Sequence, residues 1–384
     1  MEASTLLQLA VTGLLVAALP LAMVWMSTDV NKYRKLVWTI AFLTFDLIVF
    51  GAFTRLTDSG LGCPDWPGCY GAANPFLAHA EIVKAEALLP TGPVTVVKAW
   101  IEMIHRYLAM GIGVLIVALM LKAWVQWRKT RRAEFDPVMP TALFFFVCLQ
   151  GAFGAWTVTM KLQPAIVTGH LLLGMGLLAM IAWMGAQQDS AHRGAGVADS
   201  ASLIRPTKSL QVLAVLSAVV LAIQIGLGGW VSTNYATLAC TEFPLCGGKL
   251  VPDMDFEHGF TLWRELGKTA AGHYLPFSAL TAIHWVHRNF AFVLLAVLGY
   301  TAWRAMPQQG LRKIALGILA VLAVQAFTGL ATIYFAFPLT IAVLHNAGAA
   351  VLVVLVTMLN YKLSYETSYK SPYRFSAPAQ ARPH

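Results

Sequence analysis

The sequence has few charged residues. Asp, Glu, Lys and Arg make up 12% of its 384 residues, whereas hydrophobic residues make up 58%. A soluble globular protein has about 25% charged and about 45–50% apolar residues, so this composition excludes an ordinary soluble domain. Nine apolar runs are long enough, at roughly 20 residues, to cross a bilayer as helices; they cover 6–26, 36–54, 100–124, 138–160, 165–186, 210–231, 281–303, 312–335 and 339–361.

The chain also lacks several other patterns. Segments of about 10 residues with alternating hydrophobicity are absent, which excludes a membrane β-barrel and predicts an all-α integral membrane protein. No basic segment precedes the first apolar run, and the Arg- and Ser-rich composition of a mitochondrial transit peptide is missing. We therefore expect 6–26 to be a membrane helix with its N-terminus outside, the alternative being a cleaved signal peptide. We expect a bacterial inner membrane.

The basic residues are unevenly distributed. The net charge is +9, but 18 of the 27 Lys and Arg residues fall in one alternate set of loops. This asymmetry is typical of membrane proteins, whose basic loops face the cytoplasm. It accounts for the positive charge without nucleic acid. It also places the C-terminus in the cytoplasm and the long loops 55–99 and 232–280 on the periplasmic side.

The sequence contains an internal repeat, which indicates duplicated architecture. The segment CPDWPGC at 63–69 aligns with CTEFPLC at 240–246 at a shift of 177 residues, and both read Cys, any, acid, aromatic, Pro, any, Cys. Gly51 aligns with Gly228 at the same shift. With small changes in the shift, further residues align: His105-Arg106 with His287-Arg288, Gln150 and Gly154 with Gln325 and Gly329, and His170 with His345.

The repeat predicts two four-helix bundles that form an eight-helix core, with an extra N-terminal transmembrane helix outside it. An even number of helices per unit makes the units parallel, related by an axis along the membrane normal. The expected parts are an N-terminal helix and loop at 1–35, a first unit at 36–186, a cytoplasmic linker at 187–209, a second unit at 210–361 and a cytoplasmic tail at 362–384.

Four histidines lie within predicted spans, each about five residues from the outer end: His105, His170, His287 and His345. Ionisable groups at membrane depth are costly and often functional. Two histidines per unit at equal depth suit axial ligation of a heme iron inside a helix bundle. Buried histidines that only form hydrogen bonds are the plainer alternative. Zinc fits less well, because structural zinc prefers closely spaced ligands.

Three further charged residues lie beside these histidines. Arg106 and Arg288 each follow a histidine and are expected to bind a heme propionate or, alternatively, to reach lipid phosphate. Glu102 precedes His105 by three residues, so both lie on one helix face. Its counterpart is His284. We expect Glu102 to be a catalytic acid or base; the alternative is that it only orients an imidazole.

The four outer cysteines allow three disulfide pairings. Because each pair is local and repeated, and the outer compartment is oxidising, we expect disulfides Cys63–Cys69 and Cys240–Cys246. A four-cysteine zinc site is the alternative. Cys148 is expected to be a buried apolar residue. Each outer loop also has room for a short amphipathic helix, at 79–89 and 261–271.

Taken in order, these residues resemble the heme A synthase family, in its bacterial, cysteine-containing type. The resemblance covers about 36–361 and is carried by TRLTDSGL at 54–61, the first cysteine pair, Glu102-x-x-His105-Arg106, His170, His287-Arg288 and His345.

The resemblance implies an oxidoreductase that oxidises the C8 methyl of heme O to a formyl group, giving heme A for cytochrome c oxidase. It implies that His105 and His170 hold heme O or heme A, that His287 and His345 hold a resident heme B, and that Glu102 is catalytic. A heme O synthase and oxidase assembly factors are the partners it implies, besides membrane lipid and an electron donor or acceptor that the sequence does not identify. The oligomeric state is left open, a homo-oligomer included.

Two other functions fit parts of the pattern. A diheme electron-transfer subunit of the cytochrome b kind would move electrons without changing a heme. It pairs histidines on the same two helices, however, whereas here each histidine has its own helix. A transporter would have helices broken by Gly or Pro at the midplane and no tightly bound heme.

Overall fold

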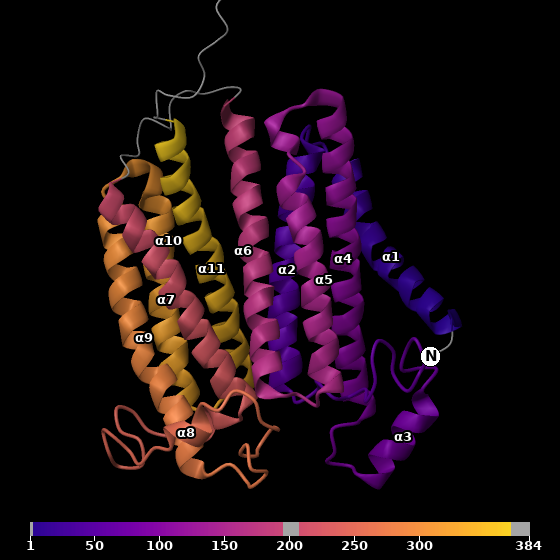
Figure 1. The fold of residues 1–384 in the computed structure, drawn as a ribbon, viewed down its shortest axis with the longest axis vertical. Coiled ribbons are helices and arrows are strands. Elements are labelled where there is room, and N and C mark those ends of the chain that lie inside the picture. The colour runs from indigo at the N-terminus through magenta and orange to yellow at the C-terminus, as the bar shows by residue number, and fades with distance from the viewer. Residues whose placement is uncertain (1–2, 195–206, 370–384) are drawn as a thin grey trace, which may run out of the picture.

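The chain folds into a bundle of long, roughly parallel helices (Figure 1). The computed structural model describes residues 3–194 and 207–369, and within these ranges the chain forms helices and no strand. The α-helices are α1 (Ala3–Met26), α2 (Lys32–Leu56), α3 (His79–Leu88), α4 (Val96–Thr130), α5 (Val138–Thr159), α6 (Pro164–Gly194), α7 (Lys208–Thr233), α8 (Phe256–Gly259), α9 (Phe277–Ala305), α10 (Gln309–Tyr334) and α11 (Leu339–Tyr369).

Nine of these helices, within the described ranges, are long and apolar enough to cross a membrane, as the sequence predicts. Eight of them begin or end two or more residues beyond the apolar runs, and α5 matches its run to within one residue. Helix α6 continues through 187–194, where we expected the linker, and α11 continues to Tyr369. The remainder of the expected linker (195–206) and tail (370–384) lies outside the described residues.

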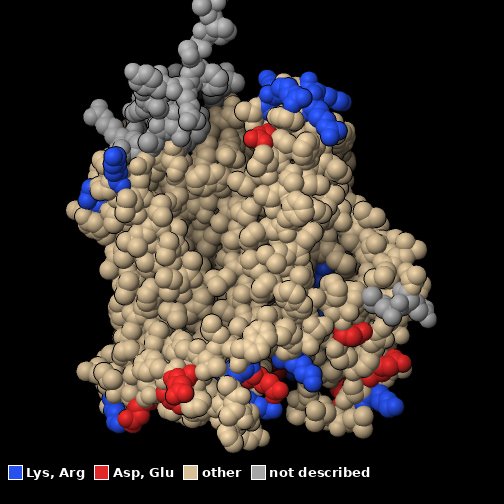
Figure 2. Space-filling model, in the orientation of Figure 1, with Lys and Arg blue, Asp and Glu red and all other residues tan. Residues whose placement is uncertain are grey.

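The distribution of charge matches a protein embedded in a bilayer. Figure 2 shows most charged side chains of the visible face gathered at the two ends of the bundle, with a broad band between them that shows almost no charge. Large apolar side chains inside the long helices α1 and α5, such as Leu15, Leu19 and Phe145, are exposed, and lipid is their expected neighbour. The protein is therefore an all-α integral membrane protein.

The core forms two four-helix units. Helices α2, α4, α5 and α6 pack around one apolar core, and α7, α9, α10 and α11 pack around another; Figure 1 shows the units side by side. Helix α1 stands outside both units and packs on α4. Small residues allow the close approach: a Cβ added at Gly111 would lie 2.6 Å from Val16 Cγ1.

The two units meet through equivalent residues. Arg55 Nη2 donates to the Ser232 carbonyl (2.6 Å), and Tyr235 donates its hydroxyl proton to Asp58 (2.5 Å). Both pairs are 177 residues apart, which is the shift that aligns the two cysteine segments. Residues that touch their own counterparts must lie next to the rotation axis. These contacts therefore locate the axis between the units, at the end of the bundle that carries both cysteine segments, hereafter the loop end.

The loop end contains α3, as predicted, but the second short helix was predicted wrongly. Residues 261–271 form turns, and a four-residue helix, α8, precedes them at Phe256–Gly259. Gly267 has φ +75°, a left-handed conformation that interrupts a helix. Asp255 caps α8 by accepting the His258 N–H (3.0 Å). The prediction for Cys148 was also wrong, since this cysteine is exposed on the outside of α5.

Candidate functional site

Each cysteine segment forms a small closed loop at the loop end. Cys63 is bonded to Cys69 and Cys240 to Cys246, so both predicted disulfides are present. In the first loop the Asp65 carboxylate accepts the N–H groups of Tyr70 (2.6 Å) and Gly71 (2.7 Å). In the second, Glu242 accepts the Gly248 N–H at 2.5 Å. The repeated acidic residue therefore closes the turn that follows the second cysteine.

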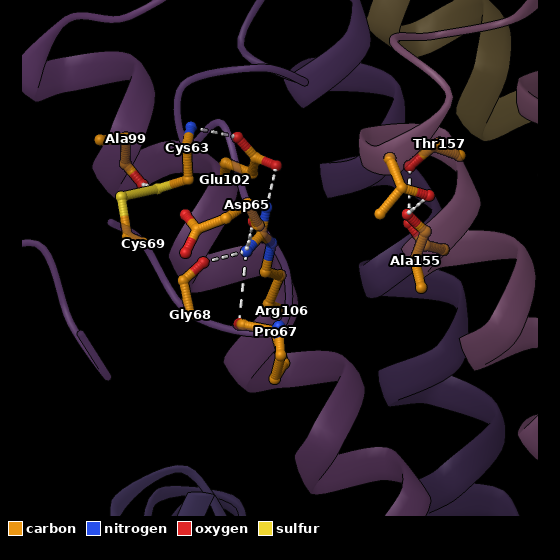
Figure 3. A network of polar contacts seen from close by, with 12 residues as sticks. Cys63, Asp65, Pro67, Gly68, Cys69, Ala99, Glu102, Arg106, Ala155 and Thr157 are labelled. Atoms are coloured by element: carbon orange, nitrogen blue, oxygen red, sulfur yellow. Dashed lines mark hydrogen bonds and ion pairs between the residues drawn. A yellow bond between two sulfur atoms is a disulfide. The ribbon is translucent and has the colours of Figure 1, made fainter. Parts of the chain in front are cut away.

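The arginines after His105 and His287 hold these loops in place. Arg106 donates to the carbonyls of three loop residues, at 2.9, 3.3 and 2.5 Å: Asp65, Pro67 and Gly68 (Figure 3). Arg288 donates to the three equivalent carbonyls of the second loop at 2.8, 3.1 and 3.1 Å: Glu242, Pro244 and Leu245. Each guanidinium thus fixes a disulfide loop above a histidine. The expected propionate contact of these arginines stays a prediction.

Glu102 joins the first loop to the helix that carries His105. Its Oε2 accepts the Cys63 N–H at 2.8 Å, and its Oε1 accepts from Arg106 at 2.5 Å (Figure 3). The side chain is buried, with 4% of its residue surface exposed. The paired arginine and the amide donor both favour a carboxylate at this depth.

In the second unit His284 occupies the same place. Its Nδ1 lies 3.3 Å from the backbone nitrogen of Cys240, which donates to it. The two halves therefore share one construction, in which the first cysteine of each loop donates to the side chain three residues before a histidine. Only the first unit has a carboxylate there. The difference that the sequence indicates between the units, Glu102 in the first and His284 in the second, thus lies at the residue that each loop contacts.

Each of the four histidines packs against a glycine of a neighbouring helix. A Cβ added at Gly51 would lie 3.0 Å from the His105 ring, and the corresponding distances are 3.2 Å at Gly154 from His170, 2.9 Å at Gly228 from His287 and 3.4 Å at Gly329 from His345. Real Cβ contacts of this kind are rare below 3.4 Å. The repeated glycines therefore make room for imidazole rings.

The histidines form one pair in each unit. His105 on α4 lies against Gly51 of α2, and His170 on α6 lies against Gly154 of α5, so both belong to the first unit. His287 and His345 belong in the same way to the second unit. All four residues keep part of their surface exposed, and His170 Nδ1 is buried without a hydrogen-bond partner. Two imidazoles in one unit, on residues that are not fully buried, fit a planar group bound between them through iron.

Four polar residues around the rings were not recognised as functional from the sequence. Gln150, Gln224 and Gln325 each donate to the backbone carbonyl of a histidine on the neighbouring helix. Thr328 lies 2.9 Å from His345 Nδ1. The signal available was the spacing, because each glutamine stands four residues before one of the histidine-contacting glycines.

The zinc alternatives receive no support. In the part of the chain that the structure describes, no group of three or more His, Cys, Asp or Glu is arranged to hold a metal ion. The four loop cysteines are bonded to one another in disulfides and cannot serve as thiolate ligands. The histidines remain as two separated pairs.

Comparison with known proteins agrees with this arrangement. Residues 34–357 match the COX15-CtaA family model, described as cytochrome oxidase assembly protein. A protein of Shewanella oneidensis named heme A synthase is 36% identical over 332 residues, covering 86% of this chain and 97% of the relative. Proteins of the same name from Sinorhizobium medicae and Methylobacterium are each 28% identical, covering 84% and 82% of this chain and 88% of each relative.

The matched region begins after α1 and contains nearly all of both four-helix units, both disulfide loops and all four histidine–glycine contacts. Its extent includes most of the chain, so the match is not confined to one repeat. The chain belongs to the COX15-CtaA family of cytochrome oxidase assembly proteins.

Proposed function

We propose that this protein is a heme A synthase, which oxidises the C8 methyl of heme O to the formyl group of heme A. The single observation that carries the proposal is the pair of glycine-packed histidines in each unit with a buried carboxylate, Glu102, on the helix of the first pair only. The relatives that bear this name are similar over nearly their whole length.

The two histidine pairs have different roles in this proposal. His105 and His170 hold the substrate heme in the first unit, 36–186, because only this unit has a carboxylate under its loop. His287 and His345 hold a resident heme B in the second unit, 210–361. Bound there, heme B supplies one-electron redox chemistry. A diheme subunit of the cytochrome b kind is not favoured, since the relatives are named for synthesis.

Glu102 is the proposed catalytic residue. It lies one helical turn before His105, on the same face of α4, where it would act on a heme held by His105. Cys63 and Arg106 hold both carboxylate oxygens. In this position Glu102 stabilises positive charge that develops on the substrate and accepts a proton from it.

The two disulfide loops, each bound by an arginine, cover the histidine pairs at the loop end of the bundle. Arg106 binds three carbonyls of the first loop and pairs with Glu102, so the loop, the arginine and the carboxylate form one unit. A heme propionate that approached Arg106 would compete with these carbonyls. In the cell, the loop end faces the bacterial periplasm and the linker end faces the cytoplasm.

The test is to purify the protein from cells that make heme O, extract its hemes and separate them by chromatography. Heme B together with heme O or heme A is expected. Glu102→Ala should retain heme but accumulate heme O or a hydroxylated intermediate, whereas His284→Ala, the matched change in the second unit, should still give heme A. Wild-type amounts of heme A from Glu102→Ala would refute the catalytic role of this residue.

A further inference from the structure

The four histidines are held to their neighbouring helices unequally. Three helices carry the pattern Gln-x-x-x-Gly, in which the glycine contacts a histidine ring: α5 at 150–154, α7 at 224–228 and α10 at 325–329. The fourth helix, α2, has Leu47 at the equivalent place before Gly51. The repeat is therefore complete for His170, His287 and His345, and broken for His105.

Each glutamine fixes the backbone of one histidine. Nε2 donates to the histidine carbonyl at 3.0 Å for Gln150, 3.2 Å for Gln224 and 3.0 Å for Gln325. The fit around the Gln325 amide is close, because a Cβ added at Gly348 would overlap with it. Leu47 has no polar atom and cannot make this bond to α4.

The rings of the second pair are fixed as well. The Thr328 hydroxyl lies 2.8 Å from the Val324 carbonyl and 2.9 Å from His345 Nδ1. When its proton goes to the carbonyl, its oxygen accepts from an Nδ1–H, and that tautomer of His345 keeps a free lone pair on Nε2. The Gln224 amide lies 3.2 Å from His287 Nδ1. Both rings of this pair thus have a partner on the adjacent helix.

The rings of the first pair have no such partners. Phe153 stands where Thr328 stands in the repeat, and His170 Nδ1 is buried and unpaired. Among the described residues no hydrogen bond reaches the His105 ring. The ring lies against Gly51 and stacks with Phe50, the two ring centroids being 6.3 Å apart. His105 is therefore held least of the four.

We propose that Gln150, Gln224, Gln325 and Thr328 are positioning residues that fix three of the histidines, and that Leu47 leaves His105 as the displaceable ligand of the substrate pair. The inference rests on the proposed function, because it treats the four histidines as heme ligands. It explains how one repeated fold keeps a permanent group in the second unit and exchanges a group in the first. Partners of ligand imidazoles set ring orientation and ligand strength.

Carbon monoxide bound to the reduced, purified protein tests the proposal, because it binds ferrous heme where an axial ligand is displaced. A double variant, His287→Ala with His345→Ala, leaves the first-unit heme, and His105→Ala with His170→Ala leaves the second-unit heme. The first-unit heme should bind carbon monoxide and the second-unit heme should not. Gln8→Leu, on the exposed side of α1, is the control for replacing a glutamine by leucine, as in the Gln224→Leu variant below.

Two substitutions then exchange the properties of the units. In the His287→Ala/His345→Ala variant, which keeps the first-unit heme, Leu47→Gln should weaken carbon monoxide binding about two- to ten-fold, the effect of one added neutral hydrogen bond. In the His105→Ala/His170→Ala variant, which keeps the second-unit heme, Gln224→Leu should allow the heme to bind carbon monoxide. Unchanged binding in either variant at normal heme content would overturn the inference.

The results that would refute the proposed function differ from those that would overturn this inference. Heme at both pairs with no heme A formed would refute the synthase proposal while the carbon monoxide comparison stays valid. A purified protein without any heme would overturn both.

Discussion

Cys63 donates its backbone N–H to the Glu102 carboxylate across 2.8 Å, so a hydrogen bond connects the disulfide loop directly to the candidate catalytic residue. The equivalent bond in the second unit runs from Cys240 to His284 Nδ1 at 3.3 Å. The duplicated loop thus donates a backbone hydrogen bond to a carboxylate in the first unit and to an imidazole in the second.

Removing the carboxylate should loosen the first loop alone. In Glu102→Ala the Cys63 amide loses its acceptor and Arg106 loses its ion-pair partner, so amide hydrogen exchange in 63–71 should accelerate. His284→Ala should accelerate exchange in 240–248 instead. Equal exchange of both loops in both variants would contradict this local coupling.

Removing the arginine should destabilise the protein. Arg106→Met leaves Glu102 buried without its cation, and breaking a buried ion pair costs about 3–5 kcal/mol. Arg106 is 9% exposed and Glu102 4%, so solvent replaces little of the interaction. Arg288→Met, which breaks no ion pair with a buried carboxylate, should cost less. Thermal unfolding in detergent measures both; equal losses would show that the ion pair contributes nothing of its own.

The histidine-contacting glycines should not tolerate alanine. In Gly228→Ala the new Cβ would lie 2.9 Å from the His287 ring, and overpacking of this kind costs about 1–3 kcal/mol. The variant should lose the heme that we propose for the second unit, measured by absorbance per mole of protein. Gly113→Ala and Gly299→Ala are matched controls, because a Cβ at either place meets nothing within 4 Å. Full heme content in Gly228→Ala would show that the ring can shift freely.

The contact between the units should depend on pH. The pKa of Tyr235 is raised above its ordinary value, chiefly because burial disfavours the phenolate, with Arg55 opposing this shift and Asp58 adding to it. A raised folded-state pKa means that the contribution to stability is complete below the unfolded pKa of about 10 and is lost as pH rises through the folded pKa. Thermal midpoints between about pH 8 and about pH 11 should fall more for the wild type than for Tyr235→Phe. Parallel curves would count against this contact.

Much of the fold was predictable because hydropathy and internal repeats can be read directly from the order of the residues. The nine spans follow from apolar runs, since a backbone inside a bilayer must satisfy its hydrogen bonds as helices. The disulfides follow from two local cysteine pairs in equivalent loops. The helix expected at 261–271 failed because its amphipathic pattern continues across Gly267, whose left-handed conformation a periodicity cannot show.

The sequence by itself determined the membrane class, the duplicated units and the residue types of the candidate site: four histidines, two arginines and one unmatched glutamate. Only the tertiary structure decided what these residues touch. Arg106 could bind a propionate, a lipid or a loop, and the packing of 63–69 on α4 places three loop carbonyls around it. The unequal support of the histidines likewise depends on Gln224 and Thr328, whose partners lie on other helices. Such contacts arise from helix packing, because residues distant in the chain meet only when their helices pack together.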